Sequence, residues 1–150
     1  MFALFVAVTA SAQEFRHFSA TAIRDGVAAA ASNELRTAFE KIADRGSYSV
    51  ISVRRDKPGD VEIHRDWDDV FFVQEGSGVV VYGGEASGGV TDKGETRGGE
   101  LRKGTSRQLA AGDVVIIPAG IPHQVSPGPG GSITYVVLKV PRVRGIEDRD

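Results

Sequence analysis

Short apolar runs separated by turns that contain Gly or Pro follow one another along most of the chain. The run from Tyr48 to Arg55 is rich in β-branched residues, and a second such run extends from Val61 to Arg65. Val70 to Gln74 is almost continuously apolar, which is typical of a strand covered on both faces. Short strands at regular spacing predict a β-sandwich or barrel, with further strands at 79–82, 107–109, 114–117 and 133–140.

The pattern becomes helical between Ser19 and Arg45. Thr21 to Ala31 is rich in Ala and predicts one helix. A second helix is expected after Ser32 or Asn33, because apolar residues recur there at i, i+3, i+4 and i+7: Leu35, Ala38, Phe39 and Ile42. Residues 13–47 are therefore expected to form a helical extension, and the second helix is expected to pack on the outside of a sheet.

The first twelve residues, M-F-A-L-F-V-A-V-T-A-S-A, resemble the end of a secretory signal peptide. An apolar run is followed by Ala10-Ser11-Ala12, an A-x-A cleavage pattern. The run is too short to span a bilayer. The alternative is an N-terminal strand from Phe2 to Val8. The signal interpretation predicts a periplasmic or secreted protein that begins near Gln13, and otherwise a cytoplasmic one.

Composition narrows the function classes. A chain of 150 residues with 41% hydrophobic residues favours one globular domain. The net charge of −2 argues against a nucleic-acid surface, which needs a basic patch. With no Cys, the chain has no disulfide, thiolate ligand or Cys nucleophile.

Metal-ligating residue types gather at two places in the predicted strands. His64 and Asp66 alternate with their neighbours, so an extended chain would direct both to one face. Asp69 begins the next run, and His123 follows a Pro-x-Gly turn. Imidazole and carboxylate are ligands of Fe(II), Mn(II), Zn(II) and Ni(II). His64, Asp66, Asp69 and His123 are therefore a candidate metal site, against the alternative of hydrogen-bonded structural His residues and a solvated Asp-rich turn.

These two stretches resemble the two signature motifs of the cupin superfamily. The second motif, Gly-x5-Pro-x-Gly-x2-His-x3-Asn, is matched from Gly112 to His123, although Pro127 replaces its terminal Asn. The first motif, Gly-x5-His-x-His-x(3,4)-Glu-x6-Gly, is matched more loosely between Gly59 and Gly76. There His64 is aligned with the first His, Asp66 with the second and Asp69 with the Glu. Asp68 is the alternative to Asp69.

The resemblance implies an all-β fold, a single antiparallel jelly-roll β-barrel over residues 48–140. It also implies one divalent metal ion (Fe, Mn, Ni or Zn) at His64, Asp69 and His123, with Asp66 as a fourth ligand or as a residue that orients a ligand. A small-molecule substrate or ligand and a homodimer are expected. Two functions stay open, a metalloenzyme of dioxygenase or isomerase type and a non-catalytic ligand-binding or sensing module. Glu62 is the best candidate for a general base.

Three further features complete the expectations. The Gly-rich stretch from Gly83 to Gly104 lacks the Lys of a phosphate-binding loop and predicts a flexible hairpin insertion. Lys139 is expected at a rim of the barrel, because a charge inside it would be costly. Residues 141–150 are expected to be a charged tail.

Overall fold

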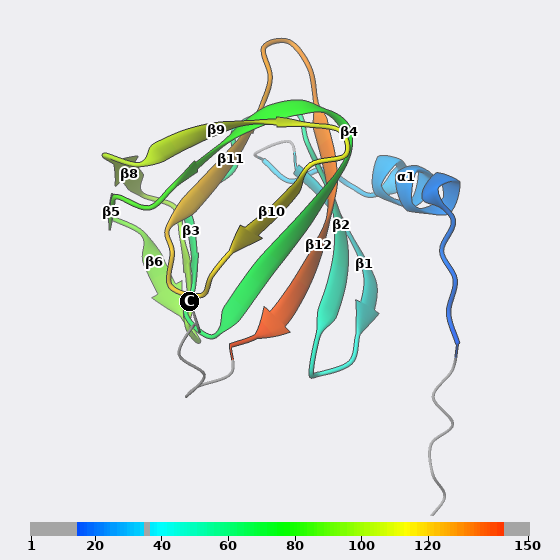
Figure 1. Cartoon of the computed structure of the whole chain (residues 1–150), viewed down its shortest axis with the longest axis horizontal. Coiled ribbons are helices and arrows are strands. Elements are labelled where there is room, and N and C mark those ends of the chain that lie inside the picture. The colour runs from blue at the N-terminus through cyan, green and yellow to red at the C-terminus, as the bar shows by residue number, and fades with distance from the viewer. Residues whose placement is uncertain (1–14, 35–36, 143–150) are drawn as a thin grey trace, which may run out of the picture.

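The computed structural model describes residues 15–34 and 37–142, which form one short helix and twelve strands (Figure 1). Every strand pairing is antiparallel. The expected all-β jelly-roll barrel is confirmed. The expected signal segment, residues 1–12, and residues 143–150 of the expected tail lie outside the described residues.

The first sheet has the order β1–β2–β12–β4–β10. Its strands are β1 (Thr37–Asp44), β2 (Ser49–Arg55), β12 (Ile133–Pro141), β4 (Trp67–Tyr82) and β10 (Val114–Ile117). Only the first part of β4 belongs here, since β10 and β12 pair with it between Trp67 and Gly76.

The second sheet starts from the other end of β4. There β9 (Thr105–Ala110) and β11 (His123–Pro127) pair with β4 between Ser77 and Tyr82. Next to β11 lies β3 (Glu62–His64). Because β4 belongs to both sheets, the two sheets form one curled structure around a shared interior.

Gly76 marks the point where β4 passes from one sheet to the other. Its φ is +77°, a conformation that favours glycine. A Cβ at this position would lie 2.0 Å from the carbonyl oxygen of Ser132. The pairing of β4 with β12 also shifts register nearby, between Thr134 and Tyr135. Glycine and a register shift are the usual devices by which a strand turns a barrel corner.

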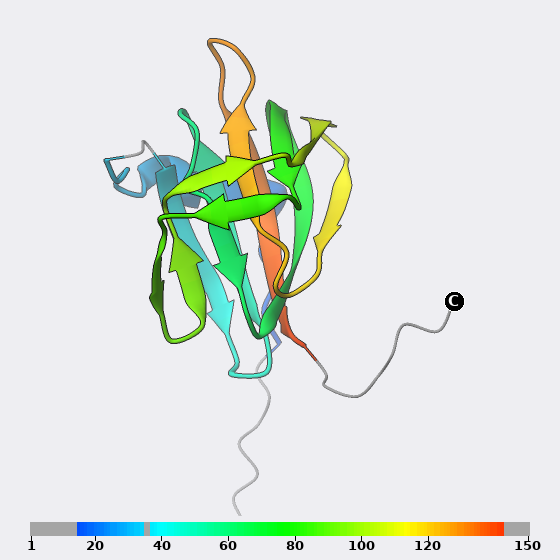
Figure 2. The ribbon, with the colours of Figure 1, turned by 90° about the vertical axis from the view of Figure 1, so that its left-hand side faces the viewer.

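The insertion between the two motifs is folded into strands rather than left as a bare loop. It contains β5 (Glu85–Ser87), β6 (Val90–Asp92), β7 (Glu95–Arg97) and β8 (Glu100–Arg102). β7 pairs with both β3 and β6, so it extends the second sheet, while β5 pairs with β8. Figure 2 looks onto this side of the molecule. The insertion therefore places side chains of β7 beside the His64 strand.

The barrel interior is filled by inward side chains from both sheets. The buried cluster consists of Val53, Phe71, Val73, Val80, Leu109, Ile117, Val125, Ile133, Tyr135 and Val137. Alternate residues of the strands contribute to it, as a two-residue period requires. Buried polar residues, among them His64, Asp69 and His123, accompany this apolar cluster.

The N-terminal segment contains one helix instead of two. α1 (Ala20–Ala29) begins at Ser19, whose hydroxyl accepts a hydrogen bond from the N–H of Ala22 at 3.1 Å. It lies against β1 and β2 and buries Val27. The expected N-terminal helix is thus present as α1, and it packs against these two strands.

The second expected helix is wrong, because residues 37–44 form β1. Ala38 and Ile42 are buried, at 4% and 8% exposure, while Phe39 lines the barrel cavity. A strand with apolar contacts on both faces, and a register shift between Lys41 and Ala43, imitates a helical spacing. Leu35 lies outside the described residues.

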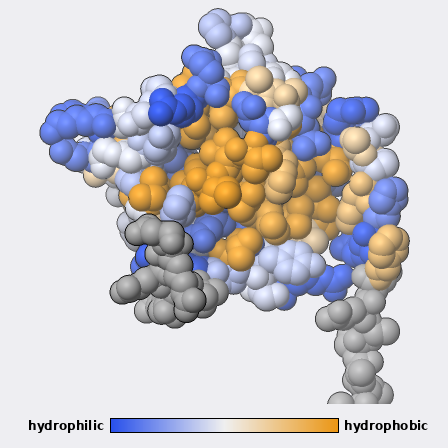
Figure 3. All heavy atoms as spheres, in the orientation of Figure 1, coloured by the Kyte–Doolittle hydropathy of each residue, from blue (hydrophilic) through white to orange (hydrophobic). Residues whose placement is uncertain are grey.

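The outer face of the first sheet is apolar around β10 and β4, as Figure 3 shows. Phe72, Val114 and Ile116 are 39%, 58% and 68% exposed. Among the described residues, no helix has the length and apolar character needed to cross a bilayer.

Candidate metal centre

A strand pairing and a turn bring the motif residues together. His64 is the last residue of β3 and His123 is the first of β11, and these strands pair at Glu62 and His123. The Pro-x-Gly turn before His123 is fixed to the first motif by its backbone, because the N–H of Gly120 donates to the carbonyl of His64 at 2.8 Å. Gly120 has φ +87°, which explains why the turn requires glycine.

Asp68 helps to hold this turn rather than facing the cavity. Its Oδ1 accepts a hydrogen bond from the N–H of Ala119 at 2.7 Å. A carboxylate used in this way fixes the two motifs to each other. Asp68 is therefore not the alternative to Asp69 that the sequence left open.

The two imidazoles are buried and face each other. His64 and His123 are both 2% exposed, and their ring centroids lie 5.3 Å apart. Each Nδ1 has a partner: Oε2 of Glu95 at 2.5 Å for His64, and the carbonyl of Ile121 at 3.1 Å for His123. A neutral ring whose Nδ1–H donates in this way presents a lone pair at Nε2, for which a metal ion and a proton compete.

Among the described residues, neither Nε2 atom has a hydrogen-bond partner, although both atoms are buried. Oxygens of Asp69 and Glu62 lie 3.2 Å and 3.4 Å from His64 Nε2, but not in hydrogen-bonding geometry. Unpaired buried polar atoms are costly and rare in folded proteins. A metal ion bound by these nitrogens would satisfy both.

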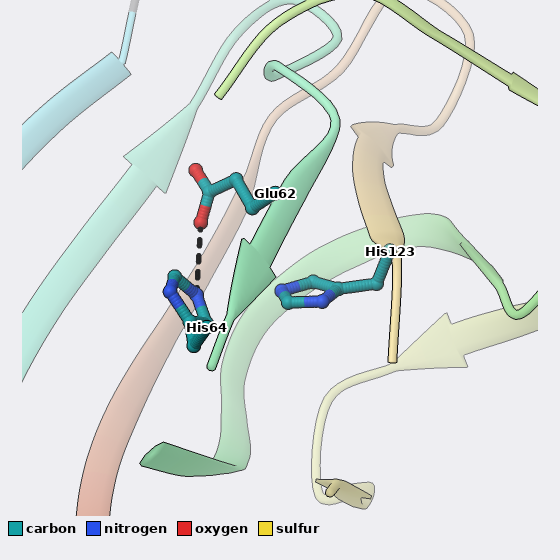
Figure 4. Close-up of side chains that lie close together, drawn as sticks. All are labelled: Glu62, His64 and His123. Carbon is teal, nitrogen blue, oxygen red and sulfur yellow. Dashed lines mark ion pairs between the residues drawn. The ribbon is translucent and has the colours of Figure 1, made fainter. Parts of the chain in front are cut away.

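Glu62 completes a set of ligand atoms with the two His residues. One atom each from Glu62, His64 and His123 lies within 4.8 Å of the others (Figure 4). Asp69 stands beside this set, because its Oδ2 also lies 3.9 Å from His123 Nε2. Two imidazoles with one or two carboxylates fit a divalent first-row metal and leave coordination positions open.

Basic side chains surround the acidic ones. Oε1 of Glu62 accepts from Arg97 at 2.8 Å and from Arg55 at 3.3 Å. Oδ1 of Asp69 accepts from Lys139 at 2.7 Å. Lys139 thus lies in the cavity wall as half of an ion pair, not at a rim as its charge suggested. In both carboxylates one oxygen is held by a cation and the other faces His64.

The ionisation of these groups follows from their neighbours. Burial disfavours the imidazolium of His64, but Asp69 and Glu62 outweigh it and raise the pKa of His64 to about 9. Burial holds the pKa of His123 below its ordinary value. Burial opposes ionisation of Glu62 and Asp69, but contacts with His64, with Arg97 for Glu62 and with Lys139 for Asp69 hold both pKa values below their usual range. The site therefore favours a positive charge between its carboxylates.

The structure brings together three of the four expected ligands. His64, Asp69 and His123 converge, whereas Asp66 does not join them. β3 ends at His64 and the chain bends at the next two residues, so the alternation that would direct Asp66 inward is broken. The Asp66 carboxylate is 37% exposed and pairs with Arg65 at 2.8 Å.

Glu62 was not predicted as a candidate ligand, although the sequence contained a sign of it. Aligned two residues earlier, Glu62 and His64 occupy the two His positions of the first motif. Then Asp69 follows His64 after four residues and Gly76 follows after six more, as the motif requires. The motif Gly falls on Asp56 in this alignment, which favoured the other register. Glu95 lies in the insertion, and no spacing rule connects it with His64.

A cavity of about 460 Å³ opens beside these residues. Its walls come from both sheets and from the insertion, and Tyr135 and Arg55 form part of them. Arg55 Nε donates to the Tyr135 hydroxyl at 2.7 Å, and both side chains are buried. Burial raises the pKa of Tyr135 to about 12, so this hydroxyl stays protonated. The volume lies in the range of small-molecule sites.

Comparison with known proteins identifies the fold. No family model and no curated protein matches the chain. Among solved structures, a conserved protein from Klebsiella pneumoniae with a double-stranded β-helix domain has TM-score 0.61 and 15% identity, over 85% of this chain and 91% of that one. The cupin domain of Schizosaccharomyces pombe Cnp3 has TM-score 0.57 and 10% identity, over 77% and 67%.

An oxalate oxidase in complex with glycolate is similar as well. It has TM-score 0.57 and 19% identity, over 80% of this chain and 59% of that one. At these identities the likeness concerns the fold. The chain has the double-stranded β-helix fold that these proteins share, which is the fold predicted by the resemblance of its two motifs to those of cupins.

Proposed function

We propose that the protein binds one divalent metal ion through Glu62, His64 and His123, with Asp69 as a fourth ligand. The observation that carries the proposal is the pair of buried Nε2 atoms without a hydrogen-bond partner. One ligand atom each from Glu62, His64 and His123 lies within 4.8 Å of the others, and Glu62 Oε2 is 3.4 Å from His64 Nε2. A metal ion between these groups would give both nitrogens a partner.

The ligand set narrows the identity of the metal. Fe, Mn, Ni and Zn all accept imidazole and carboxylate. A carboxylate in place of a third imidazole, as at Glu62, makes the set harder and favours Mn(II) or Fe(II). Arg55 and Arg97 fix the Glu62 side chain, so its second oxygen is held ready for the ion.

The metal would serve catalysis on a small organic molecule in the cavity. Bound there, a divalent ion supplies Lewis acidity and a place to hold substrate. The chain's own residues orient the ligands, exclude water from the buried His pair and neutralise the carboxylates. Glu62, ionised and held by two arginines, is a poor general base, which supports the role of ligand. An oxalate oxidase has the same fold, which supports the interpretation that this chain is an enzyme.

The test is the metal content of purified protein by elemental analysis. We expect about one ion per chain, lost in His64→Ala and in His123→Ala. His17→Ala is the control, because His17 is exposed and far from both motifs in sequence. Absence of stoichiometric metal, even after incubation with each ion, would contradict the proposal.

A non-catalytic ligand-binding or sensing module is the alternative, because the same cavity would serve it. Ligand binding that survives complete chelation of the metal would favour the module. Turnover or O₂ uptake that requires the metal would favour the enzyme.

Homodimerisation and export stay predictions. Sedimentation equilibrium of the purified chain tests the first. Expression of the chain, followed by N-terminal analysis of the secreted fraction, tests the second, and a mature terminus near Gln13 is expected.

A further inference from the structure

We infer that the ligand of the cavity is a small organic anion, a carboxylate with an apolar body, whose charged end contacts Arg97 and Lys139 beside the metal. The inference rests on the proposed metal site and names the class of molecule that this site receives. It follows from the charge of the cavity wall, from the donors left available there and from the apolar remainder.

The cavity wall carries an excess of positive charge. Its basic residues are Lys41, Arg55, Arg97 and Lys139, whereas its acidic residues are Asp60, Glu62 and Asp69. With His123 neutral, the wall has one net positive charge, and a divalent ion raises it to three. A concave site with this excess attracts anions and repels cations.

The four basic residues are not equivalent. Arg55 is 5% exposed, and all three of its guanidinium nitrogens donate within the protein, to Tyr135, Thr37 and Glu62. Arg55 therefore stabilises the cavity wall and is not the residue that binds the charged end of a ligand. Lys41 is 61% exposed and pairs with Asp44, so it lies toward solvent.

Arg97 and Lys139 have donors that a ligand can use. Arg97 is 49% exposed and lines the cavity; its Nη1 donates to Glu62, and its Nη2 lies 3.7 Å from Oε2 of Glu95, beyond hydrogen-bond distance, so a ligand can still use N–H groups of this guanidinium. Lys139 is 17% exposed and donates one of its three N–H bonds to Asp69. Arg97 lies next to Glu62 and Lys139 lies next to Asp69, the two carboxylates proposed to bind the ion. An anion bound near the ion would therefore contact both Arg97 and Lys139.

Binding of the ion reduces the negative charge that Glu62 and Asp69 present to Arg97 and Lys139. In the metal-free protein they neutralise Glu62 and Asp69. When the same carboxylates also share the charge of a divalent ion, the cations are left partly uncompensated. A carboxylate restores the balance, and a guanidinium fork matches its geometry.

The rest of the cavity is apolar. Its aliphatic and aromatic lining includes Ile51, Val53, Phe71, Val125 and Val137. Such a wall stabilises a hydrocarbon portion of the ligand by its removal from water. An inorganic anion would leave this surface unused, which favours an organic acid.

The experiment measures binding to metal-loaded protein by isothermal titration calorimetry. The probes are formate, acetate, butyrate and benzoate, together with butyramide and butylammonium as neutral and cationic counterparts of butyrate. We expect butyrate to bind at least about 10-fold more tightly than butyramide, because a charged hydrogen-bonded pair replaces a neutral one. No binding of butylammonium is expected.

Variants locate the charged end. Arg97→Met is expected to weaken butyrate binding about 10-fold and to leave butyramide unchanged, while Arg97→Lys retains part of the affinity. Arg102→Met is the matched control, because Arg102 belongs to the same insertion, is 72% exposed and pairs with Glu100. The metal content of every sample is determined first.

The outcomes separate the two proposals. Protein that holds no metal contradicts the proposed function. Metal-loaded protein that binds none of the four acids, that binds butyramide or butylammonium as tightly as butyrate, or whose butyrate affinity is unchanged in Arg97→Met overturns the anion inference alone.

Discussion

The contact between Glu95 and His64 makes a sharp prediction about metal affinity. Glu95 lies in the insertion, yet its Oε2 is 2.5 Å from His64 Nδ1. A carboxylate in this position fixes the ring orientation and makes Nε2 a stronger donor to a metal. Glu95→Gln keeps the size and an acceptor oxygen but removes the charge.

The expected magnitude follows from the exposure of Glu95. A charge-assisted hydrogen bond contributes about 1.5–3 kcal/mol, roughly twice a neutral one. The Glu95 side chain is 34% exposed, so solvent screening reduces the difference. A loss of about 1.4 kcal/mol, or about 10-fold in metal dissociation constant, is therefore expected for Glu95→Gln.

The assay is competition with a fluorescent chelator for Mn(II) or Zn(II) at one fixed pH. Glu100→Gln is the control, because Glu100 lies in strand β8 of the same insertion, is 66% exposed and pairs with Arg102. Circular dichroism and urea unfolding show whether each variant is folded. A Glu95→Gln affinity equal to wild type, in a folded protein, would refute the argument that the insertion tunes the His64 ligand.

Three further predictions concern stability, measured by urea unfolding of metal-free protein. Tyr135→Phe leaves the buried Nε of Arg55 without its acceptor and should cost about 1–3 kcal/mol, so an unchanged midpoint would count against this contact. The pKa of His64 is raised to about 9, above its unfolded value, so its contribution is complete below about pH 6.5 and is lost as the pH rises to about 9, by no more than about 3 kcal/mol. His64→Asn should flatten this decline, and a wild type equally stable at both ends of that range would contradict it. Gly76→Ala should destabilise by more than Gly46→Ala, since both have positive φ and cost about 1–3 kcal/mol in strain, but only at Gly76 does a Cβ meet a backbone carbonyl; equal losses would contradict the close approach.

Much of the barrel follows from local sequence, because its strands have clear boundaries. The continuous apolar run of β4 and the Pro-x-Gly turn before His123 indicate strands and a corner directly. The residues of β1 instead predict a helix, because they contact α1 on one face of the strand and the cavity on the other. Apolar residues on both faces of a strand, with a register shift, resemble the spacing of a helix.

The site residues were predictable where strand alternation and the motif spacing indicate the same residue. They were not predictable where the chain bends, or where a residue distant in sequence contacts the site. His64, Asp69 and His123 meet both requirements. The prediction for Asp66 is wrong because side chains alternate between faces only within an extended strand, and β3 ends at His64. Glu95 reaches His64 from thirty-one positions along the chain, through strand pairing that no local pattern specifies.

The central claim is that Glu62, His64 and His123 share one metal ion. Anomalous diffraction from crystals soaked in Mn(II) tests it most directly. The account predicts a single strong anomalous peak within bonding distance of both His Nε2 atoms and a Glu62 oxygen, absent in His123→Ala crystals. Well-ordered crystals with no peak between the two imidazoles, or with a peak that persists unchanged in His123→Ala, would contradict it.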